Sequence, residues 1–194
     1  MSIPYKIAVL VYVFNARGEL LLLHRRRPPN QDLYSPIGGK LEQAIGESPY
    51  ACALREIQEE IDVTLELKDI RLAGLVSERA FPASAPPDGS APAAAAHWLM
   101  FCFEVTRPLN FPPRQIEEGR LEWIPLDAIE RLTIPKTDRE VIWPLMRRHS
   151  VALSGVHAGG FFSVHIDCTD ADNFKVTYEH PLVSPPGSSG TIKP

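Results

Sequence analysis

Apolar runs alternate with polar turns near the start of the chain. Ile7–Phe14 and Leu20–His24 are rich in Val and Leu, and the intervening Asn15–Gly18 is polar and ends in glycine. This pattern predicts a β-hairpin. The apolar start is too short to span a bilayer and lacks a basic leader and a small-residue cleavage site, so we interpret it as a strand and not as a membrane or targeting segment.

A helix is predicted from Pro49 to Ile61. The prolines and paired glycines upstream exclude a helix until about Ser48, which can cap the helix, and Pro49 suits its first turn. At helical spacing one face is apolar and consists of Tyr50, Ala53, Leu54, Ile57 and Ile61. A separate face carries Glu56, Glu59 and Glu60 within one turn.

The rest of the chain predicts further strands, two helical segments and a final hairpin. The strands are Thr64–Leu67, Ile70–Ser77, Trp98–Thr106 and Leu121–Pro125, the helical segments are Leu126–Leu132 and Asp138–His149, and the hairpin joins Phe161–Ile166 to Phe174–Tyr178. We expect one domain over residues 1–182 and a disordered tail over 183–194. Residues 81–96, rich in Pro and Ala, form either a surface loop or a lid over a substrate.

Composition and charge narrow the function classes. The chain of 194 residues is 44% hydrophobic and 23% charged, as in ordinary globular proteins, and its net charge is -4. That charge argues against a broad electrostatic attraction to a nucleic acid polymer or to a membrane, while a local basic cluster can still bind a small anion. The three cysteines have no CxxC spacing, which favours neither a disulfide framework nor a zinc site. We therefore expect a cytoplasmic protein.

The three glutamates of the polar helix face repel one another. A hard divalent cation such as Mg²⁺ would remove that repulsion, because it prefers carboxylate and phosphate oxygens; a solvated acidic face is the alternative. The upstream turn Gly38–Lys40 lets the backbone approach a ligand closely, and Arg55 can hold a glutamate from the loop. This context favours a metal site.

These residues carry a family resemblance. Gly38-Gly39-Lys40-Leu41-Glu42, then Glu47, then Arg55-Glu56-Ile57-Gln58-Glu59-Glu60 resembles the Nudix hydrolase signature. The resemblance implies an α/β fold, an α/β/α sandwich with a mixed β-sheet, and a hydrolase of phosphoanhydride bonds that uses Mg²⁺, with Mn²⁺ as an alternative. It implies that Glu56, Glu59 and Glu60 bind the metal, that the Gly39 carbonyl adds a ligand, and that Glu47 with Arg55 braces the loop on the helix.

The motif departs from the family pattern in two places. Lys40–Gly46 is two residues longer than the pattern has before Glu47, and Asp62 stands where the family has a glycine that often needs a left-handed backbone. Aspartate tolerates that conformation better than most residues. The departures affect loop geometry and rate more than the reaction. Cys52 also faces the carboxylates, but a thiol suits a hard cation poorly, so we interpret it as packing under the loop.

The details outside the motif look most like the MutT branch, which hydrolyses oxidised purine nucleoside triphosphates. By that resemblance Arg25 and Lys40 bind phosphate, whereas Arg26 and Arg27 serve either phosphate binding or solubility. Glu117 is our choice of general base, with Glu118 close behind and Glu59 or Glu56 as alternatives. Asp138 either reads a purine edge or caps the helix that it opens, or does both. Tyr34, Phe81 and Trp143 either stack on the base or belong to the core.

The resulting hypothesis is a pyrophosphohydrolase that converts a purine nucleoside triphosphate to the monophosphate and pyrophosphate. Glu56, Glu59 and Glu117 are its catalytic candidates, and its partner is a small nucleotide. The first alternative is another Nudix reaction, on ADP-ribose, a dinucleoside polyphosphate or another nucleoside diphosphate derivative. The second is a nucleotide-binding module without catalysis.

Overall fold

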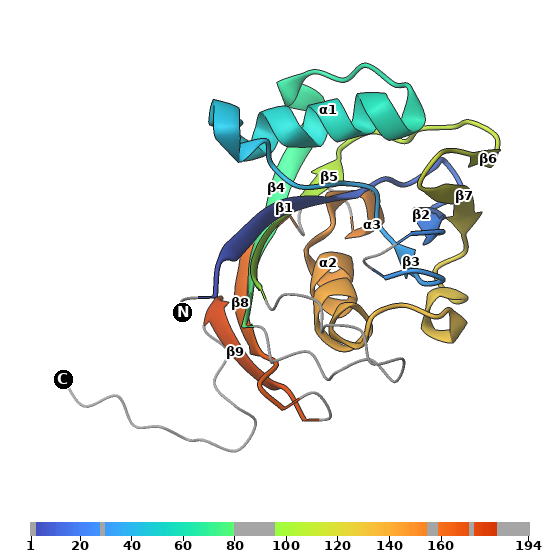
Figure 1. The fold of residues 1–194 in the computed structure, drawn as a ribbon. Coiled ribbons are helices and arrows are strands. Elements are labelled where there is room, and N and C mark those ends of the chain that lie inside the picture. Colours follow the sequence, from blue (N-terminus) through green and yellow to red (C-terminus); the bar gives the residue numbers. More distant parts are fainter. Residues whose placement is uncertain (1–2, 28–29, 80–95, 155–158, 171–172, 182–194) are drawn as a thin grey trace.

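In the residues that the structure describes (3–27, 30–79, 96–154, 159–170 and 173–181), two β-sheets form the framework of the computed structural model (Figure 1). The larger sheet is mixed, with the order β1 (Tyr5–Tyr12), β5 (His97–Val105), β4 (Ile70–Arg79), β8 (Phe162–Asp167) and β9 (Lys175–His180). In it β1 is parallel to β5 and β4 to β8, and the other neighbours are antiparallel. The smaller sheet is antiparallel, with the order β3 (Tyr34–Ser35), β2 (Leu20–Arg25), β7 (Gly119–Ile124) and β6 (Arg114–Gln115).

The helical segments connect these strands. The α-helices are α1 (Pro49–Ile61), α2 (Trp143–His149) and α3 (Val151–Ser154), the short 3-10 turns are η1 (Gln43–Ile45), η2 (Leu67–Asp69) and η3 (Ile129–Arg131), and η4 (Asp138–Ile142) is a π-helical turn. In the described residues no helix is both long and apolar enough to cross a membrane.

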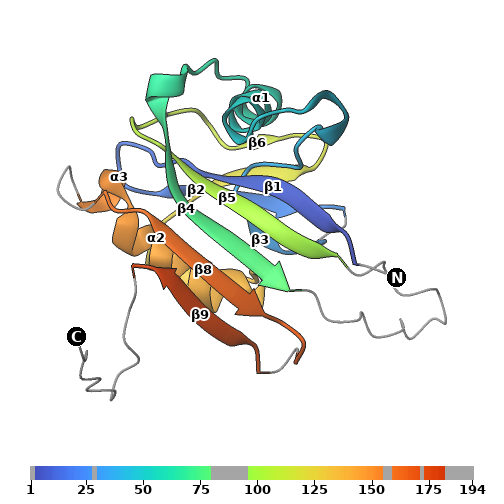
Figure 2. The same ribbon diagram turned by 90° about the vertical axis from the view of Figure 1, so that its left-hand side faces the viewer.

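The larger sheet lies between α1 and α2 (Figures 1 and 2). Side chains alternate between the faces of a strand. Accordingly Cys102 belongs to the buried cluster that contains Met146 of α2, whereas Phe103 belongs to the cluster that contains Ile57 of α1. This confirms the expected α/β/α sandwich with a mixed sheet.

The prediction of a hairpin at residues 7–24 is wrong in its pairing. The turn at Asn15 forms, since the Asn15 N–H donates to the Glu19 carbonyl at 3.0 Å and Phe14 bridges Leu20. Beyond the turn the two strands separate, because β1 pairs with β5 in the larger sheet and β2 pairs with β7 in the smaller one. The apolar pattern predicted both strands but not their partners.

Two other predicted elements differ from the structure. Thr64–Leu67 is not a strand; a capping box between Glu66 and Asp69 begins the turn η2 there instead. The helix predicted over 138–149 begins two residues earlier, at Lys136. It passes through the π turn, in which the Trp143 N–H donates to the Asp138 carbonyl, and is α-helical again from Trp143. Pro144 has no N–H to donate, which favours the irregularity at this point.

The remaining element predictions agree with the structure at their centres. Ile70–Ser77, Trp98–Thr106 and Leu121–Pro125 fall on β4, β5 and β7, and the final hairpin is β8 with β9. Only Ile129–Arg131 of the helical segment predicted at 126–132 is helical. The predicted tail 183–194 and nearly all of the predicted loop or lid 81–96 lie outside the described residues.

Candidate active site

Helix α1 starts and ends where its sequence predicts. The Ser48 hydroxyl accepts a hydrogen bond from the Ala51 N–H at 3.2 Å, and Pro49 occupies the first turn. At the other end Asp62 adopts the left-handed conformation, with φ 53° and ψ 42°, and its N–H donates to the Gln58 carbonyl. The Gln58 amide also donates to the Asp62 carboxylate at 3.0 Å. Aspartate therefore fills the position where the family has glycine.

Arg55 joins the loop to the helix. Its Nε and Nη2 donate to the two carboxylate oxygens of Glu47 at 2.9 and 3.0 Å, and Nη2 also donates to the Lys40 carbonyl at 3.2 Å. The Arg55 hydrogen bonds lower the pKa of Glu47 to about 2. The longer loop folds into η1 and closes with Gly46 in the left-handed region, so it still delivers Glu47 to Arg55.

The three glutamates of the polar helix face differ in their surroundings. Glu56 and Glu59 accept hydrogen bonds from Arg55 Nη1 at 2.8 and 3.0 Å, and the side chain of Glu59 is 58% exposed. Glu60 is only 6% exposed, and its Oε2 is buried with no hydrogen-bond partner among the described residues. Burial, and then the nearby carboxylates of Glu56 and Glu118, raise the pKa of Glu60 to about 8.

Gly39 lies directly against Glu56. A Cβ atom at Gly39 would stand 2.2 Å from Glu56 Oε1, so a side chain at this position would displace the carboxylate. The Gly39 carbonyl accepts a hydrogen bond from the Val9 N–H at 2.8 Å, which leaves one lone pair of that oxygen for another partner. The loop backbone and the helix carboxylates therefore meet at this point.

The helix carboxylates and the Gly39 carbonyl are the kinds of oxygen that suit a divalent cation, but they are not already gathered around one point. Among the described residues, no three carboxylate, imidazole or thiol groups are gathered closely enough to form a finished metal site. The reason is visible in the contacts of Arg55, which hold Glu56 and Glu59 on its guanidinium. The buried Oε2 of Glu60, which has no hydrogen-bond partner among the described residues, is an oxygen that a divalent cation would suit.

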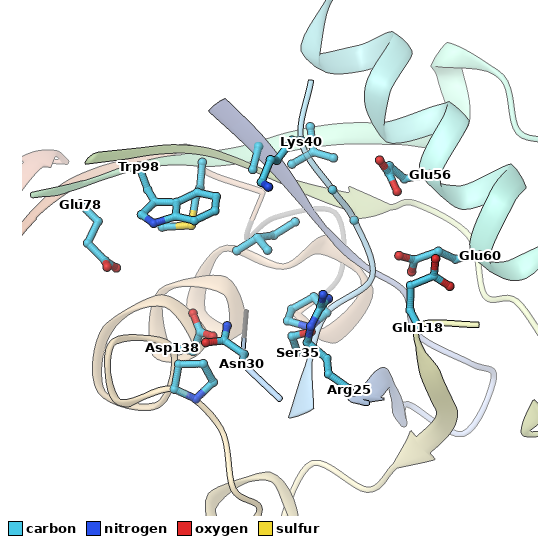
Figure 3. Close-up of a pocket in the computed structure, with 18 of the residues that line it drawn as sticks. Arg25, Asn30, Ser35, Lys40, Glu56, Glu60, Glu78, Trp98, Glu118 and Asp138 are labelled. Carbon is cyan, nitrogen blue, oxygen red and sulfur yellow. The ribbon is translucent and has the colours of Figure 1, made fainter. Parts of the chain in front are cut away.

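A pocket of about 540 Å³ gathers most of the residues that the sequence singles out. Its lining includes the predicted residues Gly39, Glu56, Glu59, Glu60, Arg25, Lys40 and Asp138. Figure 3 shows Glu56, Glu60 and Glu118 at one end, Glu78, Trp98 and Asp138 at the other, and Lys40 and Arg25 between them in this view. We call these the hydrolytic end and the selective end.

The structure places Glu117 away from this pocket. Its side chain is 72% exposed and accepts a hydrogen bond from Arg27 Nη1 at 2.8 Å, whereas Glu118 lines the pocket. The geometry therefore favours the second of the two loop glutamates for any role at the reacting phosphate. Arg27 takes part in this surface ion pair and does not line the pocket.

The predicted aromatic residues lie elsewhere. Trp143 is buried and stacks on Tyr12 in the core, with ring centroids 6.4 Å apart, and Tyr34 stacks on His24 while its hydroxyl donates to Glu122 at 2.7 Å. Phe81 lies outside the described residues. Cys52 is buried under the loop, 3.4 Å from Arg55 Nη2, as the packing interpretation requires.

Asp138 lines the pocket from within η4 and not from a capping position. The residue before the turn is Thr137, which makes no side-chain capping bond. Burial, and then the carboxylate of Glu78, raise the pKa of Asp138 to about 7. Capping therefore does not account for this aspartate, and its place in the pocket is consistent with ligand recognition.

The lining residues that the sequence reasoning missed include Asn30, Ser35, Glu78 and Trp98. Glu78 follows the predicted strand Ile70–Ser77, and Trp98 begins the predicted strand Trp98–Thr106. The position of both residues at the end of a predicted strand was a signal that could have been used. Only the pairing of β4 with β5, however, shows that the two residues are neighbours.

Comparisons with known proteins agree with the fold and the motif. The family model described as the NUDIX domain matches residues 4–143. A MutT protein from Bacillus halodurans superposes with a TM-score of 0.63 at 22% identity, covering 90% of this chain and 97% of its own; one from Methanosarcina mazei gives 0.59 at 22%, covering 77% and 99%. The NUDIX domain of Shewanella oneidensis NrtR, solved with ADP ribose, gives 0.54 at 16%, covering 76% and 88%.

The match to the family model spans the glycine turn, the helix with its glutamates and the strands that carry the pocket. The solved structures, at these identities, show the same fold with MutT proteins among them. The chain therefore belongs to the NUDIX domain family, as a hydrolase of phosphoanhydride bonds.

Proposed function

We propose that the protein is a Mg²⁺-dependent pyrophosphohydrolase that cleaves a purine nucleoside triphosphate, oxidised purines included, to the monophosphate and pyrophosphate. One observation carries the proposal. A single pocket holds the helix carboxylates, the cations Arg25 and Lys40, and an end with Trp98 and Asp138. A nucleoside triphosphate with a bound metal presents matching groups in the same order: the metal would meet the carboxylates, the phosphates would meet the cations, and the base would meet Trp98 and Asp138.

The hydrolytic end would hold the metal. Glu56, Glu59 and Glu60, with the Gly39 carbonyl, are the proposed ligands; Mg²⁺ is the first choice and Mn²⁺ the alternative. The bound cation would polarise phosphate oxygens and lower the pKa of water. Arg25 and Lys40 would neutralise the charge of the phosphates that do not react. Glu47 and Arg55 would keep the glycine loop on the helix.

A glutamate would take the proton of the attacking water. The water oxygen forms a bond to phosphorus, the bridging P–O bond breaks, and pyrophosphate leaves with the electron pair of that bond. Glu118 lines the pocket beside Glu60, so we assign it the role first considered for Glu117, with Glu56 as the other candidate. Asp138 would bind the base.

A substrate panel tests the reaction. The purified protein is assayed with Mg²⁺ on GTP, 8-oxo-GTP, ATP, ADP-ribose and a dinucleoside tetraphosphate, and products are separated by ion-exchange chromatography. We expect purine triphosphates to give the monophosphate and pyrophosphate, and the Glu59→Gln variant to be much slower. Cleavage of ADP-ribose without any cleavage of triphosphates would contradict the proposal and would identify the enzyme as a hydrolase of ADP-ribose instead. Nucleotide binding with no turnover would identify a binding module.

The proposed location is the cytoplasm, with a small nucleotide as the partner. Cys52, Cys102 and Cys168 are all buried free thiols, which is consistent with a reducing compartment. Alkylation of the three cysteines after denaturation of the protein from its native cells would show them reduced.

A further inference from the structure

The selective end of the pocket is built by segments that are distant in the sequence. Glu78 of β4 is the cross-strand partner of Trp98 of β5, so their side chains lie on the same face of the sheet. Both line the pocket, as does Asp138 from η4. A carboxylate from a strand, a carboxylate from a helical turn and the ring of a tryptophan therefore border the same space (Figure 3).

Contacts at this end fix Glu78 in place. Its carboxylate accepts a hydrogen bond from the side chain of Thr137, the residue before Asp138, and burial raises its pKa. The carboxylates of Glu78 and Asp138 interact electrostatically. The strand and the π turn are thus linked through these residues, and Glu78 is held toward the pocket.

Charge determines which part of a ligand can occupy the selective end. A phosphate beside Glu78 and Asp138 would meet two acidic groups, whereas Arg25 and Lys40 offer it cations elsewhere in the pocket. An occupant that donates hydrogen bonds to the carboxylate oxygens suits this end better. The flat face of Trp98 suits a planar ring, and the amide of Asn30, which also lines the pocket, suits a ring with both donors and acceptors. A quaternary ammonium group cannot form these hydrogen bonds, because it has no N–H to donate.

We propose that Glu78 is a specificity-determining residue that, together with Asp138, selects a ring with adjacent imino and amino N–H groups, the 2-amino-4-oxopyrimidine edge that guanine and pterin share. This inference rests on the proposed function, because it names the head group of the triphosphate that the same pocket hydrolyses. A ring nitrogen and the neighbouring amino group donate to the carboxylates. Removing the amino group leaves a buried carboxylate oxygen unpaired, which weakens binding.

Binding of monophosphates tests the inference without turnover. The dissociation constants of guanosine and inosine monophosphates, which differ by the 2-amino group, are measured by calorimetry with Mg²⁺. We expect the wild-type protein to prefer the guanosine form by about tenfold or more, and Glu78→Gln to reduce the preference to roughly threefold or less. Glu130→Gln, at an exposed position outside the pocket lining, is the charge-matched control and should retain the full preference.

The outcomes separate the inference from the function. An unchanged preference in folded Glu78→Gln, or no preference in the wild type, overturns the role of Glu78 even if triphosphates are hydrolysed. If Glu78→Gln does not fold, Asp138→Asn takes its place under the same criterion. Competition by neopterin against guanosine monophosphate would identify pterin as an acceptable ring, and its absence would restrict the site to guanine. Failure of the proposed function appears separately, as a wild-type protein that cleaves no triphosphate.

Discussion

The two ends of the pocket use the same kinds of side chain in different ways. At the hydrolytic end, Glu56 and Glu59 come from one turn of a single helix and share the guanidinium of Arg55. At the selective end, Glu78 and Asp138 come from a strand and a π turn, and Glu78 is held by a neutral hydroxyl. Under the proposed function, this difference means that one group of acidic residues in the pocket binds the metal and the other selects the ligand. Substitutions should separate turnover from preference accordingly.

The largest expected effect is the loss of turnover in Glu60→Gln. One oxygen of its buried carboxylate has no hydrogen-bond partner in the part of the chain that the structure describes, so a metal would be a suitable partner. We expect the rate to fall by at least about a hundredfold, in Mg²⁺-saturated steady-state assays. The preference for guanosine over inosine monophosphate should not change. Without metal the variant should be as thermally stable as the wild type or more so at neutral pH, because burial disfavours the charged form of Glu60 and glutamine does not carry that cost. A rate near the wild-type value would remove Glu60 from the ligand set.

Gly39→Ala is the next test, because it acts on the backbone of the hydrolytic end. The new Cβ would stand 2.2 Å from Glu56 Oε1 and push the carboxylate away. We expect turnover to fall by roughly tenfold to a hundredfold, since small misplacements of a catalytic group are costly. Gly18→Ala is a suitable control, because nothing lies within 4 Å of a Cβ there and only its positive φ is strained. Equal effects of the two substitutions on turnover would contradict the close approach of loop and helix.

Substitutions of the neighbouring loop residues Glu117 and Glu118 test which of the two belongs to the hydrolytic end. Glu118→Gln should lower turnover by at least about tenfold, because the residue lines the pocket beside Glu60. Glu117→Gln should remain within about twofold, since that side chain is exposed and paired with Arg27. Rates measured across a pH series test whether Glu118 acts as a base, because the loss of a base flattens the acidic limb of the pH–rate profile. The reverse order of the two variants would restore Glu117 as the base.

The smallest effect on turnover is expected from Glu47→Gln, which weakens the Glu47–Arg55 ion pair, the brace that joins the loop to the helix. Arg55 lowers the pKa of Glu47 to about 2, below the value of the unfolded chain. The brace therefore stabilises the fold fully above the unfolded pKa, and that contribution is lost as the pH falls toward 2. We expect the variant to be destabilised by about 1–3 kcal/mol at neutral pH and the difference to shrink in acid. Urea unfolding of both proteins at several pH values measures this, and a pH-independent difference would show that the ion pair is not its source.

Local spacing explains why the hydrolytic end could be predicted from the sequence. The positions of Glu56, Glu59 and Glu60 follow from the period of one helix, and Ser48 and Asp62 mark its ends. The contact of Arg55 with Glu47 is also local, because the residues between them are the N-cap and the first turns of α1. Even so, the hydrogen bonds that turn Glu56 and Glu59 toward Arg55 depend on rotamers, which the period of a helix does not fix.

The selective end could be predicted only in part. Asp138 was proposed from a family resemblance, but nothing near Glu78 in the sequence indicates that β4 pairs with β5 on one side and β8 on the other. The same limit produced the wrong partner for β1, whose apolar residues are compatible with either sheet. Long-range strand pairing is decided by the packing of the whole chain, so a single strand pattern cannot reveal it.

The register of β4 against β5 has a consequence for how this pocket could diversify. Glu78 faces Trp98, and Ser77 faces Leu99, on opposite sides of the same sheet. A slip of one residue in β4 would turn every side chain of that strand over, exchanging Glu78 for a serine or an arginine at the pocket. Insertions or deletions between the two strands could thus replace the ligand preference in a single evolutionary step, while the helix that carries the proposed metal-binding glutamates remained unaltered.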